Sequence, residues 1–112
     1  MIRGTTAQFK FKLPCEKQYI ERAAIKFWQP NNHSDLLPII KHETDCTNPG
    51  DSTELCISLT AEETARFLDT CRAKVQIRVK LSDGTVFGSK PQFVVVYPMD
   101  DEILKEDLEN QI

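Results

Sequence analysis

The chain has 112 residues, of which 40% are hydrophobic and 28% are charged, and its formal net charge is −3. These values are ordinary for one globular domain that is long enough to bury a core. The charge is uneven, because residues 100–112 hold six acids and one lysine, which leaves residues 1–99 close to neutral. The sequence therefore shows no basic stripe of the kind that binds nucleic acid, and we expect no direct nucleic-acid contact.

The beginning of the chain does not have the pattern of a secretion signal. Met1–Thr6 leads directly into strand-like alternation, without the apolar stretch of a signal peptide. No apolar run approaches the roughly 18–20 residues that cross a bilayer. We therefore expect a soluble cytoplasmic protein that does not enter a membrane.

Alternating polar and apolar residues predict three strands in the first half of the chain. The first spans Thr5–Leu13 and stops at Pro14, which has no N–H to donate to a neighbouring strand. The second spans Tyr19–Gln29; a helix competes for its beginning, but the β-branched and aromatic residues that follow favour a strand. The third spans Leu36–His42, and Pro38 makes it an edge strand or a bent one. The inward side chains of the first two strands are Phe9, Phe11, Leu13, Ala23, Ile25 and Phe27.

A fourth strand and a short helix are predicted next. The strand spans Glu54–Leu59, and its inward residues are Leu55, Ile57 and Leu59, with Cys56 and Ser58 facing outward. The segment Thr60-Ala61-Glu62-Glu63 is a capping box, in which the side chains of the first and last residues bond each other's backbone N–H groups. About two to three helical turns should follow, to about Asp69, and should bury Ala65 and either Leu68 or Phe67.

Residues 73–97 predict a β-hairpin. In its first arm an apolar series alternates with a polar one, so that one face is buried and the other lies in water. The turn contains Asp83-Gly84, a strong hairpin pattern because glycine tolerates a positive φ. The second arm spans Thr85–Tyr97 with a break at Pro91. The apolar series of the first arm is Val75, Ile77, Val79 and Leu81, and the polar series is Lys74, Gln76, Arg78 and Lys80.

The end of the second arm is apolar on both faces. A strand of a two-layer sandwich normally has one face in water. Because Phe93, Val95 and Tyr97 point one way, Val94 and Val96 form a second apolar face, which the tail, a loop or a partner protein must cover. Trp28, on the outward side of the second predicted strand, points to the same need. We therefore predict that Trp28, Val94 and Val96 contact a partner.

The tail, Met99–Ile112, is acidic and amphipathic. Leu104, Leu108 and Ile112 recur four residues apart, with Ile103 beside them, which is helical spacing. A free peptide of about thirteen residues is mostly disordered in water, so this tail becomes a helix only when its apolar stripe docks. A solvated terminus is the alternative. We predict a domain at 1–99 and a tail at 100–112, with Ile103, Leu104 and Leu108 as contacts.

Residues that support catalysis or metal binding show no suitable pattern. His33 and His42 lie in or beside loops, and the four glycines do not cluster into a phosphate-binding loop. The adjacent acids Glu62-Glu63 are explained by helix capping. A zinc site from His42, Cys46 and Cys56 would lack the closely spaced pairs that such sites use. We expect a protein that is not an enzyme, with no metal or cofactor and no catalytic residue.

The cysteines at 15, 46, 56 and 71 are expected to be reduced thiols, because disulfides are rare in a cytoplasm. Cys15 and Cys71 flank Trp28 at separations similar to those of the disulfide and tryptophan of immunoglobulin domains. Neither cysteine lies in the middle of a predicted strand, however, which argues against a disulfide between them.

Several stretches resemble small all-β proteins of unknown function that are encoded in tailed phages and prophages of Firmicutes. The matching residues are Met1-Ile2-Arg3-Gly4-Thr5-Thr6, Leu13-Pro14, Leu59-Thr60-Ala61-Glu62-Glu63-Thr64, Val75-Gln76-Ile77-Arg78-Val79 and Asp100-Asp101-Glu102-Ile103-Leu104. The resemblance covers most of the chain, and its motifs are structural. It implies a compact all-β domain from the region of virion structural genes, located in the bacterial host cytoplasm when made and also in the virion. It implies no functional residues.

A looser resemblance links Leu59–Phe67 to the helical turn before the sixth strand of immunoglobulin variable domains. Phe67 stands in place of the corner tyrosine, and Asp69 stands in place of the cysteine. We predict an all-β, immunoglobulin-like antiparallel β-sandwich of six or seven strands with one short helix and an acidic tail.

The expected function is that of a non-enzymatic phage structural or assembly module, such as a head, neck or tail component, that binds itself or another protein. The alternative is a phage accessory protein that blocks a host protein such as a defence enzyme, with its acidic tail mimicking nucleic acid. A metal or redox role for the cysteines is a third and weaker reading.

Overall fold

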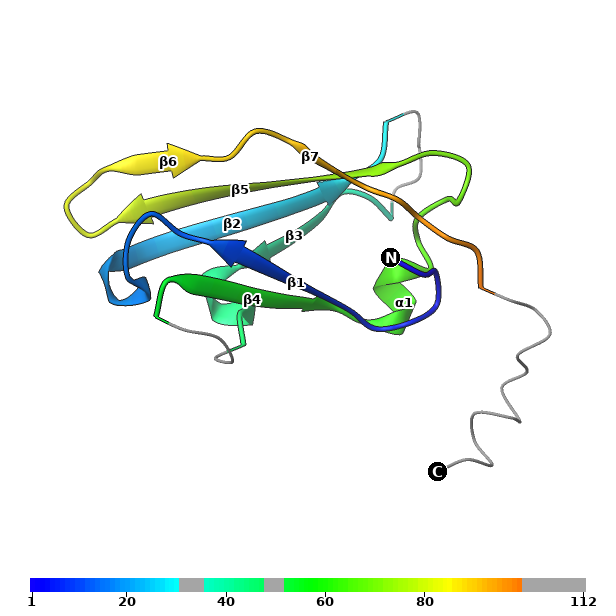
Figure 1. Ribbon diagram of the computed structural model, residues 1–112, viewed down its shortest axis with the longest axis horizontal. Coiled ribbons are helices and arrows are strands. Elements are labelled where there is room, and N and C mark those ends of the chain that lie inside the picture. Colours follow the sequence, from blue (N-terminus) through cyan, green and yellow to red (C-terminus); the bar gives the residue numbers. More distant parts are fainter. Residues whose placement is uncertain (31–35, 48–51, 100–112) are drawn as a thin grey trace, which may run out of the picture.

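The computed structural model describes residues 1–30, 36–47 and 52–99. Within them, seven strands form two antiparallel sheets that face each other (Figure 1). The smaller sheet pairs β1 (Ala7–Lys12) with β4 (Glu54–Leu59). The larger sheet has the order β3 (Ile39–His42), β2 (Ile20–Trp28), β5 (Ala73–Leu81) and β6 (Val86–Gly88), and β7 (Gln92–Val94) also pairs with β5. The short helices are η1 (Lys17–Tyr19), η2 (Glu43–Asp45) and α1 (Ala61–Thr64).

The strand order is that of an immunoglobulin-like sandwich. In that fold strands B and E are neighbours in one sheet, and C′, C, F and G lie side by side in the other. Here β1 and β4 take the places of B and E. The strands β3, β2 and β5 take those of C′, C and F, and β6 and β7 together take that of G. The helix α1 lies between β4 and β5, so the predicted fold class is confirmed.

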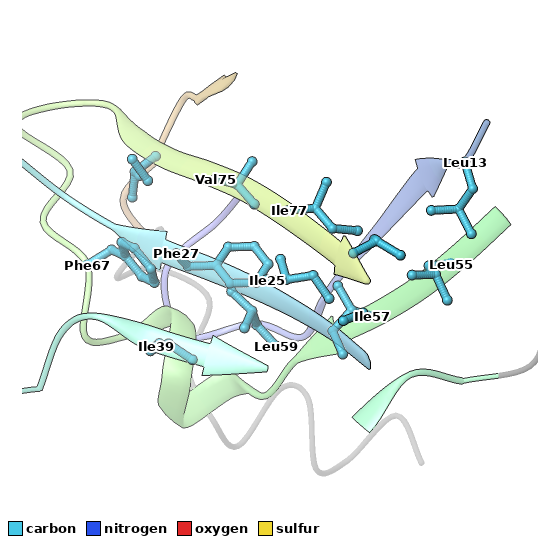
Figure 2. Packing of buried hydrophobic residues seen from close by; sticks show 14 residues of the cluster. Leu13, Ile25, Phe27, Ile39, Leu55, Ile57, Leu59, Phe67, Val75 and Ile77 are labelled. Atoms are coloured by element: carbon cyan, nitrogen blue, oxygen red, sulfur yellow. The ribbon is translucent and has the colours of Figure 1, made fainter. Parts of the chain in front are cut away.

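The core fills the space between the sheets, and strand alternation builds it. Ala23, Ile25 and Phe27 of β2 are buried, as predicted. Ile25 and Phe27 face Leu55, Ile57 and Leu59 of β4 across the sandwich (Figure 2). The rings of Phe9 and Phe27 meet between the two sheets at a centroid distance of 5.1 Å. Burial of these apolar side chains is the main favourable contribution to folding.

The hairpin at 73–97 forms as predicted. Gly84 has a φ of +91°, and its N–H donates to the carbonyl oxygen of Leu81 at 3.0 Å to close the turn. The second arm is divided into β6 and β7 around Pro91. At this break the Ser89 hydroxyl oxygen accepts the N–H of Ile77 at 3.1 Å, so a side chain takes the place of a backbone partner.

Two details in the middle of the chain differ from the prediction. Cys56 alternates with the core residues Leu55 and Ile57 and lies opposite the exposed Lys10, so it is on the outer side of β4 as predicted. It is buried there, however, where Thr47 pairs with it at the edge of the smaller sheet. The helix has only four residues, and Ala65 and Leu68 are exposed, whereas Phe67 is fully buried. The N–H of Phe67 bonds the carbonyl oxygen of Thr64 at 3.2 Å, a tighter turn that ends the helix and directs the ring into the core.

The capping box of α1 is complete and is tied to the opposite sheet. The Thr60 hydroxyl accepts the N–H of Glu63 at 3.2 Å, and the Glu63 carboxylate accepts the N–H of Thr60 at 2.9 Å. The same carboxylate pairs with the Lys41 ammonium of β3 at 2.8 Å. Partial burial raises the pKa of Glu63, but the hydrogen bonds from Lys41 and Thr60 outweigh it and leave this pKa below its ordinary value.

Replacing Glu63 with glutamine is expected to lower the free energy of unfolding at pH 7 by about 1–2 kcal/mol, because charged hydrogen bonds become neutral ones. A carboxylate with a lowered pKa in the folded state stabilises above its unfolded pKa, and this contribution is lost as the pH falls through the folded pKa. Urea unfolding between pH 3 and 7 should therefore show a flatter acid limb for Glu63→Gln. The control is Glu62→Gln, whose side chain is 87% exposed; equal pH profiles for the two variants would contradict the assignment.

Candidate protein-interaction surface

The structure reverses the predicted orientation of the last strand. Val96 is only 5% exposed and belongs to the core, and Val94 is half-buried against it. Val94 pairs with Ala73, whose side chain faces inward, so the even-numbered residues of this arm also face inward. The residues that face outward are Phe93, Val95 and Tyr97, which are 60%, 47% and 55% exposed. The assignment of Val94 and Val96 to the open face was therefore wrong.

The outward residues continue into the first residues of the chain. Ile2 forms a parallel bridge with Tyr97, and the backbone N–H of Arg3 donates to the carbonyl oxygen of Tyr97 at 3.0 Å. The Met1 nitrogen donates to the carbonyl oxygen of Val95 at 2.9 Å. Ile2 is exposed, as are the three outward residues of the last arm. Together they form a row of exposed apolar side chains, the edge strip: Ile2, Phe93, Val95 and Tyr97.

The edge strip stands on a fixed support. The Arg3 guanidinium donates to the carbonyl oxygens of Phe67 and Ala65, the latter at 3.0 Å. These carbonyls follow α1, where a helix end leaves carbonyl groups without intrahelical partners. Arg3 thereby connects the first residues of the chain to the connection between β4 and β5. A backbone bonded in this way holds the edge strip in place before any partner arrives, which lowers the entropy cost of binding.

Trp28, the third predicted contact, lies on the outer face of β2 and is half-buried. The Lys26 ammonium lies 4.9 Å from the centre of its ring. Phe93 is approached in the same way by Lys74 at 5.4 Å and by Arg72 at 5.8 Å. Each aromatic side chain therefore has cations against its ring, a favourable contact that also covers part of its apolar surface.

The outer face of the larger sheet is basic. Alternate residues of β2 and β5 point outward and bring five cations together: Arg22, Lys26, Lys74, Arg78 and Lys80. Lys80 lies 3.9 Å from Glu21, and none of the other four forms an ion pair with a described residue. We refer to this surface as the basic face. The sequence prediction of no basic stripe was wrong, because cations far apart in the chain become neighbours when β2 pairs with β5.

Two adjoining hollows of about 730 and 680 Å³ lie on the basic face. Both are lined by Ala24, Arg78 and Val86. The methyl group of Ala24 is short beside its long neighbours, which leaves room at the centre of the face. The first hollow also contains Arg22, Lys80 and His42, and the second contains Lys26 and Ile40. The floor is therefore partly apolar and the surroundings are cationic.

Glu43 is the acidic residue that lines the first hollow, and its carboxylate is already bonded. Glu43 directly follows His42, the last residue of β3, and its carboxylate accepts the N–H of Ala23 at 3.1 Å. This backbone hydrogen bond is the main cause that holds the pKa of Glu43 below its ordinary value, so the group stays charged. Arg22, Arg78 and Lys80 nevertheless outnumber this single carboxylate, and the hollow is positive.

The other predictions concern the tail contacts, the cysteines, a metal site and a membrane-spanning segment. Ile103, Leu104 and Leu108 lie outside the described residues. No disulfide joins any of the four cysteines, all of which lie in the described part of the chain, and burial raises the pKa of Cys46. Within residues 1–30, 36–47 and 52–99, no group of three or more His, Cys, Asp or Glu side chains is placed to hold a metal ion. In the same part of the chain, no helix is long and apolar enough to span a bilayer.

Comparisons with known proteins do not assign the chain to a group. No protein-family model matches it, and no curated protein matches it. The edge strip and the basic face are therefore assigned from the exposure, charge and strand pairing of residues in this chain. The polar series Lys74, Gln76, Arg78 and Lys80 was visible in the sequence as the wet face of a strand. This series becomes part of a larger cationic surface because the register of β2 against β5 brings Arg22 and Lys26 beside it.

Proposed function

We propose that the protein is a non-enzymatic structural or assembly module of a tailed-phage particle, acting through contacts with proteins. The observation that carries the proposal is the edge strip, in which apolar side chains face outward at alternate positions of the last arm. A solvated strand normally carries polar residues at such positions, and exposed apolar patches are typical of protein interfaces. The phage setting rests on the resemblance of the sequence motifs.

The edge strip makes a specific prediction about self-association. We expect light scattering after gel filtration to give a mass for the full chain that rises with protein concentration. The double variant Phe93→Ser, Tyr97→Ser should weaken this association at least about tenfold, because buried aromatic side chains dominate interface energies. The matched control is Leu68→Ser, which changes an exposed leucine outside the strip.

Two results would contradict self-association through the edge strip. One is a wild-type chain that stays monomeric at every concentration tested, and the other is equal association of the double variant and the wild type. Circular dichroism of each variant should show unchanged strand content, since all three side chains are exposed. A loss of mass that accompanied unfolding would not count as evidence for an interface, so the fold is checked first.

An alternative proposal is a phage accessory protein that blocks a host protein. The observation that favours it is the acidic tail, whose six acids resemble the charge density of nucleic acid. Such a protein would be monomeric, and its binding to the host protein would be lost when the acids of 100–112 are changed to amides. The mass measurement above separates the two proposals, because only the assembly module self-associates.

A further inference from the structure

We propose that the acidic tail of one copy, residues 100–112, binds the hollows on the basic face of a second copy. The chains would thus be joined head to tail. The inference deepens the proposed assembly function and rests on it. It names the partner, a second copy of this chain, and the two surfaces that meet.

The charges are complementary. The tail has the acids Asp100, Asp101, Glu102, Glu106, Asp107 and Glu109 against Lys105, a net charge of −5. The basic face has five cations; four of them form no ion pair with a described residue, and Glu43, near Arg22, is the carboxylate that lines the first hollow. Opposite charges on two surfaces raise the rate of encounter and disfavour other partners.

The apolar residues also match. Ala24, Ile40 and Val86 line the hollows, and the last two are exposed although they are large and aliphatic. The tail carries Leu104, Leu108 and Ile112 at intervals of four residues among its acids. An amphipathic segment with an apolar stripe fits a partly apolar groove with cationic surroundings. Nucleic acid would satisfy the cations but would leave Ile40 and Val86 without apolar partners.

The length of the tail favours a second copy over the same copy. The first hollow lies beside Lys80, and β7 pairs with β5 at Ala73, about 23 Å away along the strand at 3.3 Å per residue. After Val94 the chain continues away from β6, toward the first residues (Figure 1). Five more residues lead to Met99 and add up to about 17 Å. Thirteen residues span about 20 Å as a helix and about 43 Å fully extended. A chain's own tail would have to be fully extended to reach Lys80 in the first hollow. Gln76 in the second hollow lies only about 10 Å along β5 from Ala73, so the length of the tail favours a second copy at the first hollow, and mixing of variants decides for the second.

Direct binding tests the inference without reference to oligomeric state. The receptor is a full-length tail variant, Glu102→Lys, Glu106→Lys, Glu109→Lys, whose own tail no longer competes. A fluorescent peptide of residues 99–112 is titrated with it, and its anisotropy should rise. The substitutions Arg78→Glu and Lys80→Glu, here called the hollow variant, are then introduced into the same receptor chain. They should weaken its binding of the peptide at least about tenfold, because attraction becomes repulsion. Arg22→Glu, on the neighbouring strand, should weaken binding in the same direction.

The control receptor carries Lys10→Glu and Lys12→Glu, which make the same change of charge on the exposed side of β1. It should bind the peptide as tightly as the unmodified receptor. Equal loss with the control and the hollow variant would overturn the inference, since the contact would then be a general charge effect. Failure of the peptide to bind any receptor would overturn it as well. Neither result bears on the edge strip, whose serine variants test the assembly function separately.

Mixing then distinguishes a second copy from the same copy. In full-length chains, the hollow variant and the tail variant should each have a lower mass than the wild type. An equimolar mixture should recover association, because the unchanged tail of the hollow variant can bind the unchanged hollows of the tail variant. If each chain instead binds its own tail, the wild type stays monomeric and excludes the peptide, which overturns the inference. Tighter binding of a DNA duplex than of the peptide would overturn it in favour of nucleic acid.

Discussion

Replacing Val96 with lysine should lower the free energy of unfolding by about 3–5 kcal/mol, the cost of an uncompensated charge in a core. Val96 lies among buried apolar residues, and its side chain is almost completely covered. An ammonium group at this position would lose its hydration without gaining an ion pair. The urea midpoint should fall steeply, and at 37 °C a large part of the protein should be unfolded.

The neighbouring substitution Val95→Lys provides the matched control. Val95 has the same side chain, one residue away, but faces outward in the edge strip. We expect its free energy of unfolding to stay within about 0.5 kcal/mol of the wild type, as for most surface substitutions. Its effect should instead appear in the association measured by light scattering. Equal urea midpoints for the two variants would contradict the orientation of this arm.

Replacing Gln29 with leucine should cost about 2–4 kcal/mol of stability, because three part-buried hydrogen bonds to backbone groups are lost together. The Gln29 amide nitrogen donates to the carbonyl oxygens of Leu68 at 2.6 Å and of Cys71 at 2.9 Å. Its amide oxygen accepts the N–H of Leu68 at 2.8 Å. One buried side chain thus holds the segment between α1 and β5 against the end of β2. Leucine has a similar size but supplies none of these bonds.

Hydrogen exchange measures this effect locally, because the amide proton of Leu68 should lose protection in the Gln29→Leu variant. Gln76→Leu is the control. Its side chain donates one hydrogen bond, to Ser89 at 2.8 Å, and it is half-buried on the outer face. We expect a loss of about 1 kcal/mol there. If the two glutamine variants had the same stability, the bonds of Gln29 would not be holding the connection.

Strand positions in this chain could be predicted from the sequence because alternation and turn residues act locally. The predicted bounds of β4 agree with the structure, and Asp83-Gly84 forms the turn of the hairpin. The capping box could be predicted for the same reason, since Thr60 and Glu63 are three residues apart. The length of α1 could not, because burial of Phe67 depends on the two sheets that enclose it.

The interaction surface was harder to predict, because it depends on pairings between distant segments. In Phe93–Tyr97 every residue is apolar, so alternation cannot tell which face is inside. The structure decides through the pairing of Val94 with Ala73 and of Tyr97 with Ile2. The basic face has the same origin, since Arg22 and Lys80 are neighbours only in the register of β2 against β5. Trp28 could be placed outward because its strand has a polar face.

The pairing of residues 1–3 with residues 95–97 has a consequence for synthesis on the ribosome. The Met1 nitrogen and its acceptor on Val95 are 94 residues apart in the chain. This edge of the sandwich therefore cannot close until the last arm has left the exit tunnel, and contacts between such distant segments form slowly. Until then, the core lacks Val96 and is open on that side. A nascent chain held at this stage would present apolar core residues to chaperones, and a stop codon before residue 96 would make that state permanent.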